Sequence, residues 1–216
     1  MAADLPDSDH APTETLTPAT PDGYGDPTEF EYPLWLLVVG SVLLFPVATL
    51  LFGGVLWTVQ GPTVFESLAV VSERPTGLTF VFRWPLIVGV TLLALGVTVV
   101  VHEFVHGLVF GRYGYRVSYG AMPQIGAFYA TPFHQFVARE HVFPVALAPL
   151  VAISAVGVPL LAVPVPFVAF FVFQVLVVNA VGAVGDLYVV AYLLGKPEGT
   201  LLYDSDVRHS YVFEPR

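Results

Sequence analysis

The chain has 216 residues, of which 56% are apolar and only 12% are charged, and it contains no cysteine. So much apolar surface excludes an ordinary soluble globular domain and favours a protein that crosses a membrane several times. The absence of cysteine excludes disulfide bonds and thiolate metal sites, so any metal must be bound by His, Asp or Glu.

The net charge of −9 is concentrated near the N-terminus. Eight of the 17 acidic residues precede residue 33, and no Lys or Arg does. The same segment is rich in Pro, Thr and Gly, and its apolar content is too low for it to fold alone. We therefore expect residues 1–32 to form a disordered acidic tail, residues 33–195 a polytopic membrane domain and residues 196–216 a cytoplasmic tail.

Four apolar segments are long enough to cross a bilayer as helices. Trp35 and Trp57 bracket the first segment 22 residues apart, roughly 33 Å at the helical rise, which matches two interfacial aromatic belts. The fold class is therefore an all-α membrane protein with about four transmembrane helices. These helices are predicted over about 33–58, 85–110, 142–163 and 167–194.

The connections between these helices contain strand signals. The loop between the first two helices favours a short strand pair around Pro75 to Gly77. Residues 111–140 alternate apolar and polar positions with Gly and Pro between them, which predicts a short β-hairpin between helices two and three. A free edge of this hairpin can pair with an extended substrate, or the hairpin is an ordinary interfacial one.

The second helix contains three ionisable side chains at membrane depth: His102, Glu103 and His106. Such residues are costly in a bilayer and indicate a functional site. The spacing is H-E-x-x-H, which places both histidines on one face of a helix, close enough to bind one Zn²⁺, while the glutamate can polarise a metal-bound water. The alternative is a pair of interfacial histidines that reach the headgroups, with Glu103 paired to one of them.

The distribution of basic residues predicts the orientation in the membrane. With four spans and the N-terminus inside, six basic residues face the cytoplasm and two face outside, whereas the opposite orientation reverses these numbers. We therefore place both termini and the long second loop in the cytoplasm, and the protein in the plasma membrane.

This orientation identifies a third metal ligand. Helices two and four run in the same direction, so ligands on them must lie at equal depth. His102 is ten residues before Arg112, and Asp186 is ten residues before Lys196, so both lie roughly 15 Å inside the first cytoplasmic basic residue. Asp186 thus completes a His₂-carboxylate set. The alternative is that Asp186 pairs with Arg112 or Arg116 at the interface.

Other polar residues are weaker candidates. Asn179 lies two turns before Asp186 on nearly the same face and can bond a substrate carbonyl or a developing oxyanion, or else another helix as a structural contact. His134 and His141 are possible substitute ligands, or simply solvated histidines at a helix start. Glu140 is a further spare candidate.

Part of the chain resembles a known family. HEFVHGLVF in a membrane helix is followed by ALAP and then by N-x₆-D within NAVGAVGDLYVV. This pattern, from about Arg83 onward, resembles a family of membrane zincin peptidases related to the site-2 intramembrane metalloproteases. The chain differs from site-2 proteases proper, because no proline lies between Asn179 and Asp186 and Leu187, not glycine, follows the aspartate.

The resemblance implies that His102, His106 and Asp186 bind one zinc ion and that Glu103 is the catalytic base. We expect hydrolysis of peptide bonds in membrane or membrane-proximal proteins, with Glu103 as general base on a zinc-bound water. The expected partners are a membrane protein or peptide substrate and the lipid bilayer, and no nucleic acid. The alternatives are a non-proteolytic membrane scaffold or chaperone-like protein, and a metal-ion transporter, since His and Asp in membrane helices also form ion pathways.

Overall fold

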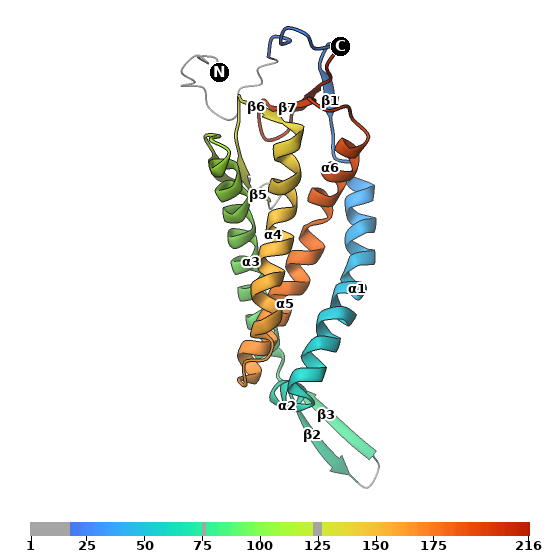
Figure 1. The fold of residues 1–216 in the computed structure, drawn as a ribbon. Helices are drawn as coiled ribbons and strands as arrows, with labels where there is room; N and C mark the ends of the chain where they lie inside the picture. The colour runs from blue at the N-terminus through green and yellow to red at the C-terminus, as the bar shows by residue number, and fades with distance from the viewer. Residues whose placement is uncertain (1–17, 75–76, 123–126) are drawn as a thin grey trace. The chain divides into compact units, whose positions relative to one another are not determined.

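The structure, a computed structural model, describes residues 18–74, 77–122 and 127–216 (Figure 1). Within these residues, four helical stretches are long and apolar enough to cross a membrane. This confirms the expected helical membrane fold with about four spans. The stretches are α1 (Leu34–Gln60), α3 (Trp84–Arg112), α4 (Arg139–Leu160), and α5 (Pro166–Gly182) continued by α6 (Val184–Leu194).

The fourth span differs from the single helix expected over 167–194. It is interrupted at Ala183, whose N–H contacts the carbonyl oxygens of Asn179 and Val181. The neighbouring Gly182 and Gly185 are poor helix formers, which explains why the helix breaks here. The break places Asp186 in the first turn of α6, where the helix dipole favours a negative charge.

Two antiparallel hairpins connect the helices, as the strand signals predicted. The short helix α2 (Thr63–Leu68), which the sequence did not reveal, leads into the first hairpin. The turn expected at Pro75 and Thr76 lies outside the described residues. The paired strands are β2 (Ala69–Arg74) with β3 (Gly77–Phe82), and β4 (Ser118–Met122) with β5 (Ala127–Thr131).

The chain folds into two compact units. The first comprises the described residues up to Pro33 together with Glu103–Ala148 and Asp186–Arg216. The second comprises Leu34–His102 and Pro149–Gly185.

The first unit contains a four-stranded antiparallel sheet in the order β1, β8, β7, β6. Phe30, Leu193 and Val212 are buried in its core, which joins the sheet to α6. Helix α4 begins at Arg139, three residues before the start expected for helix three, and Phe136 to Ala138 directly before it form a strand. The strands are β1 (Thr28–Phe30), β6 (Phe136–Ala138), β7 (Leu201–Asp204) and β8 (Ser210–Phe213).

The sheet changes the expectation for the N-terminal tail. Residues 18–32 were expected to be disordered, but Thr28 pairs with Val212 and Phe30 with Ser210. The segment after α6 is folded as well, because it supplies β7 and β8. Lys196 donates a hydrogen bond of 2.7 Å to Glu214, and this bond raises the pKa of the Lys196 ammonium above its ordinary value.

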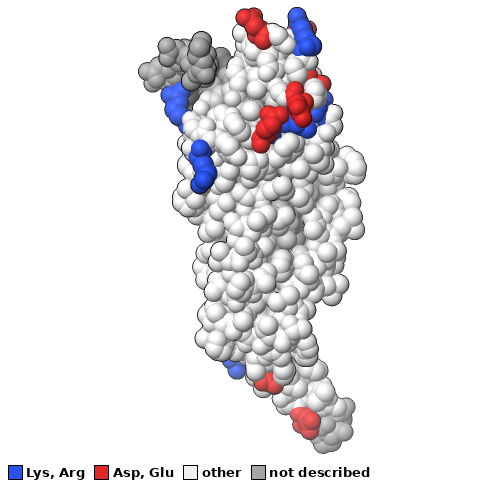
Figure 2. Space-filling view, in the orientation of Figure 1, with Lys and Arg blue, Asp and Glu red and all other residues white. Residues whose placement is uncertain are grey.

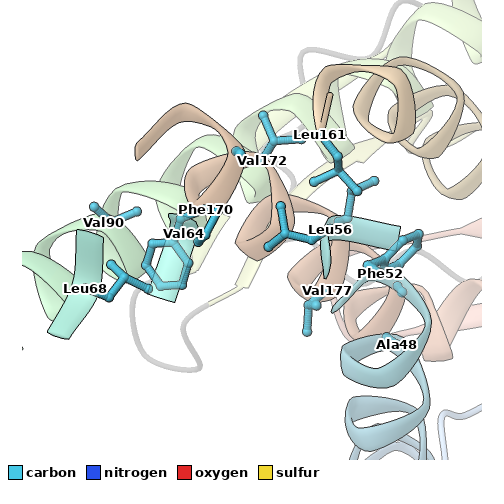
Figure 3. Packing of buried hydrophobic residues seen from close by; sticks show 13 residues of the cluster. Ala48, Phe52, Leu56, Val64, Leu68, Val90, Leu161, Phe170, Val172 and Val177 are labelled. Atoms are coloured by element: carbon cyan, nitrogen blue, oxygen red, sulfur yellow. The ribbon is translucent and has the colours of Figure 1, made fainter. Parts of the chain in front are cut away.

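The second unit has an apolar core between α1, α2 and α5 (Figure 3). Ala48, Phe52 and Leu56 recur at a spacing of four along α1 and are all buried. This spacing places them on one face of the helix. Leu161 and Leu176 are fully buried in the same cluster.

The outer helix surfaces are apolar rather than polar. Leu50 and Trp35 are 76% and 69% exposed, although water would not favour such exposure. On the face drawn in Figure 2, some charged side chains appear beside the sheet of the first unit and others at the β2–β3 hairpin, and most of the long-helix surface is white. A hydrocarbon environment accounts for this surface.

Candidate metal centre

Helix α3 brings both histidines to one side. Residues 84–112 form one unbroken helix, so His102 and His106 are one turn apart and project from the same face. His106 is 9% exposed. Glu103 follows the first histidine directly, and its side chain is therefore rotated by about 100° from the histidine face.

His106 is held by a carbonyl oxygen from α4. Its Nδ1 lies 3.0 Å from the carbonyl oxygen of Val145. In a regular helix the N–H four residues later would occupy that oxygen, but residue 149 is proline and has no N–H. Pro149 therefore leaves the Val145 carbonyl available to the histidine, and Nδ1 of His106 must carry the proton that it donates.

His102 is held in the same way by a side chain. Its Nδ1 lies 3.0 Å from Oδ1 of Asn179, which is fully buried. Nδ2 of Asn179 donates to the carbonyl oxygen of Pro149 at 3.3 Å, so the amide oxygen must face the histidine. Since that oxygen only accepts, Nδ1 of His102 is the donor and its Nε2 keeps the lone pair that a metal needs.

Asp186 completes the group. Its Oδ1 lies 3.3 Å from Nε2 of His106, and the side chain is 19% exposed. One ligand atom each from His102, His106 and Asp186 lie within 4.8 Å of one another. The break in the fourth span, next to two glycines, directs this carboxylate from the start of α6.

This donor set fits zinc. Two imidazoles and one carboxylate are the ligands of many catalytic zinc sites, which keep a fourth position for water or substrate. The fit is strengthened by the hydrogen bonds at both Nδ1 atoms, because a metal-binding histidine usually donates its other ring nitrogen to a carbonyl or carboxylate group.

The spare candidates lie elsewhere. Nδ1 of His141 accepts or donates at 2.8 Å with the Tyr115 hydroxyl, and the imidazole stacks on Tyr113. Oε1 of Glu140 accepts from the N–H of Gly199. Neither residue belongs to the three-residue group found among the described residues.

His134 is also outside this group. Its φ of 58° is unusual for a residue other than glycine, and its Nδ1 lies 3.3 Å from the Tyr203 hydroxyl. It therefore contacts the sheet of the first unit through β7.

The sequence did not reveal the partners of the two histidines. Asn179 was expected either to contact the substrate or to bond another helix, and in the structure it bonds His102 of α3. Val145 and Pro149 were not singled out for a role. A usable signal was present for them, because a proline within an apolar helix frees the carbonyl group four residues before it.

A pair of histidines four residues apart on a helix, with a glutamate after the first, defines the zincin class of site. Here that helix is long and apolar enough to cross a membrane. Residues 95–201 match the model of a protein family described as "Putative zincin peptidase". This match confirms the resemblance expected from the sequence, and it includes all four residues of the expected site. The search of curated proteins and the search of solved structures each gave no match.

Proposed function

We propose that the protein is a membrane-embedded zinc metalloprotease that hydrolyses peptide bonds of membrane or membrane-proximal proteins. The observation that carries the proposal is the arrangement of His102, His106 and Asp186, whose ligand atoms converge while both histidine Nδ1 atoms are already hydrogen-bonded. The family match over residues 95–201 supports peptidase chemistry.

The residues divide the work of hydrolysis. Zinc held by His102, His106 and Asp186 would acidify a water molecule and polarise the scissile carbonyl group. Glu103 then takes the proton from the attacking water and later delivers it to the leaving amine. Asn179 and the Val145 carbonyl keep the two imidazoles in the tautomer and orientation that this chemistry requires.

The β4–β5 hairpin is the proposed place of substrate binding. Among the described residues the two strands pair only with each other, so each has a second edge without a strand partner. An extended peptide can add to such an edge through backbone hydrogen bonds. Hydrolysis favours an extended substrate, because a helical one keeps its carbonyl groups in hydrogen bonds.

The substitution Glu103→Gln tests the proposal. Purified protein in liposomes is incubated with a library of fluorogenic peptides that contain a membrane-spanning segment. We expect cleavage by the wild type and a loss of at least about 100-fold in the variant, because general-base catalysis contributes about 10²–10⁴-fold. Zinc content should not change, because Glu103 is not a ligand.

The same variant separates hydrolysis from the scaffold and transport alternatives, because neither of these needs a general base. A wild type that cleaves no peptide in the library, or a Glu103→Gln variant that cleaves as well as the wild type, would contradict the proposed function.

A further inference from the structure

A tyrosine of the β4–β5 hairpin lies against the histidine helix. Tyr119 in β4 pairs with Ala130 of β5, and the end of its phenol ring lies over Gly107 of α3. Its Oη, Cζ and Cε1 atoms are the three nearest to the place that a Cβ on Gly107 would take. A side chain at residue 107 would displace the end of this phenol.

This contact brings the hydroxyl group close to the expected catalytic base. Gly107 follows Glu103 by four residues, so the two residues share a face of α3. Cβ atoms at this spacing lie about 5–6 Å apart, and Cα–Cβ bonds tilt toward the N-terminus of a helix, here from Gly107 toward Glu103. The Tyr119 hydroxyl therefore lies about one helical turn from the start of the Glu103 side chain.

A hydrogen-bond donor at the scissile carbonyl group accelerates peptide hydrolysis. Negative charge develops on the carbonyl oxygen in the transition state, and a donor placed there in advance stabilises it. Asn179, which the sequence offered either as such a donor or as a structural contact between helices, is fully buried and contacts both His102 and Pro149. Tyr119 carries an O–H that can donate a hydrogen bond. In contrast to Asn179, the residue is 55% exposed, which leaves it accessible to a substrate.

We propose that Tyr119 is a catalytic residue whose phenol O–H donates a hydrogen bond to the oxygen of the scissile carbonyl group. The bond strengthens as that oxygen becomes negative, and the tyrosine keeps its proton throughout, while Glu103 performs the proton transfers. This inference rests on the proposed function and adds a substrate contact to it.

The substitution Tyr119→Phe removes only the hydroxyl group. Tyr24→Phe is the matched control, since the Tyr24 hydroxyl donates a hydrogen bond of 3.0 Å to the carbonyl oxygen of Gly199, and neither residue belongs to the hairpin or to α3. We expect Tyr119→Phe to lower kcat about 100-fold, as removal of one oxyanion donor does, with KM and zinc content unchanged. The control should behave like the wild type.

A phosphinic peptide, which mimics the tetrahedral transition state, provides a second measurement. Its affinity should fall in Tyr119→Phe by about the same factor as kcat/KM, because both depend on the transition-state contact. A structural role would instead change the zinc content or the melting temperature of the variant.

The inference is overturned if Tyr119→Phe cleaves and binds the phosphinic peptide like Tyr24→Phe, or if it loses zinc. When Glu103→Gln abolishes cleavage in the same assay, either result removes only the role of Tyr119. When Glu103→Gln has no effect, the proposed function itself fails.

Discussion

The two histidines are presented to a metal in the same way by different groups. Nδ1 of His106 donates to a backbone carbonyl oxygen, and Nδ1 of His102 donates to a buried amide oxygen. In both cases the bond fixes the ring and leaves Nε2 as the ligand atom. The metal affinity of the site should therefore depend on Asn179 although this residue does not contact the ion.

The substitution Asn179→Ala tests this dependence. We expect the zinc affinity to fall about 10–100-fold, the range found when the partner of a metal-binding histidine is removed. The control is Gln174→Ala on the same helix, where Nε2 of Gln174 donates to Thr91 at 2.8 Å. This control also removes a polar contact between helices, but it should leave zinc affinity unchanged.

Competition with a chromophoric chelator measures both affinities. Equal zinc affinities in Asn179→Ala and the wild type would show that the Asn179 amide only joins helices, which is the structural role that the sequence also allowed.

At the scale of single residues, the sequence predicts those parts of the site that lie close together in the chain. His102, Glu103 and His106 lie within five residues, so helical geometry alone assembles them. Asp186 could be predicted as a ligand because Asp186 and His102 each lie ten residues before a basic residue, which places them at equal depth in the membrane. The contact of Asn179 with His102 could not be predicted in the same way, because it depends on the rotation of α5 about its own axis, which a count of residues does not determine.

The prolines of α4 show how an element is adapted to the site. A proline inside a helix removes one backbone hydrogen bond and usually destabilises the helix. Pro149 removes the bond to the Val145 carbonyl, and that oxygen then accepts from His106. The hydrogen bond that the helix lacks at Val145 is thus replaced by one that orients the metal ligand His106.

The substitution Pro149→Ala restores the missing N–H and should draw the Val145 carbonyl back into the helix. We expect zinc affinity to fall about tenfold, while the melting temperature does not fall, because the helix regains a hydrogen bond. Pro144→Ala in the same helix is the control and should keep the wild-type affinity.

Chelator competition and thermal unfolding of both variants in detergent provide the comparison. A Pro149→Ala variant with unchanged affinity would mean that His106 does not need the freed carbonyl oxygen.

Element boundaries were predicted well where hydrophobicity decides them and poorly where distant pairing does. The four spans follow from apolar length, and their ends agree with the structure within three residues, although the fourth is interrupted at Ala183. The strand β1 was missed because its partner β8 lies about 180 residues away. Acidic, proline-rich composition indicated disorder, and pairing with β8 outweighs it over Thr28–Phe30.

At the scale of the whole molecule, the distribution of basic residues predicts the orientation across the membrane. The basic residues favour a cytoplasmic location for both termini, because that orientation places six of the eight inside. The β2–β3 hairpin then faces the outside. Since the chain contains no native cysteine, single cysteines can report on each side without background labelling.

The substitutions Glu73→Cys, in the hairpin, and Arg216→Cys test this orientation with a membrane-impermeant maleimide. We expect Glu73→Cys to be labelled in intact cells and Arg216→Cys only after permeabilisation. The opposite pattern would place the metal site near the outer leaflet and reverse the predicted topology.

The central claim is that two membrane spans together bind one catalytic metal ion, and the metal content of the purified protein tests it most directly. By elemental analysis we expect about one zinc per wild-type chain and a loss of zinc in both His102→Ala and Asp186→Ala, because each substitution leaves only two of the three protein ligands. A wild-type protein without stoichiometric metal, or an Asp186→Ala variant that retains its zinc, would contradict the account.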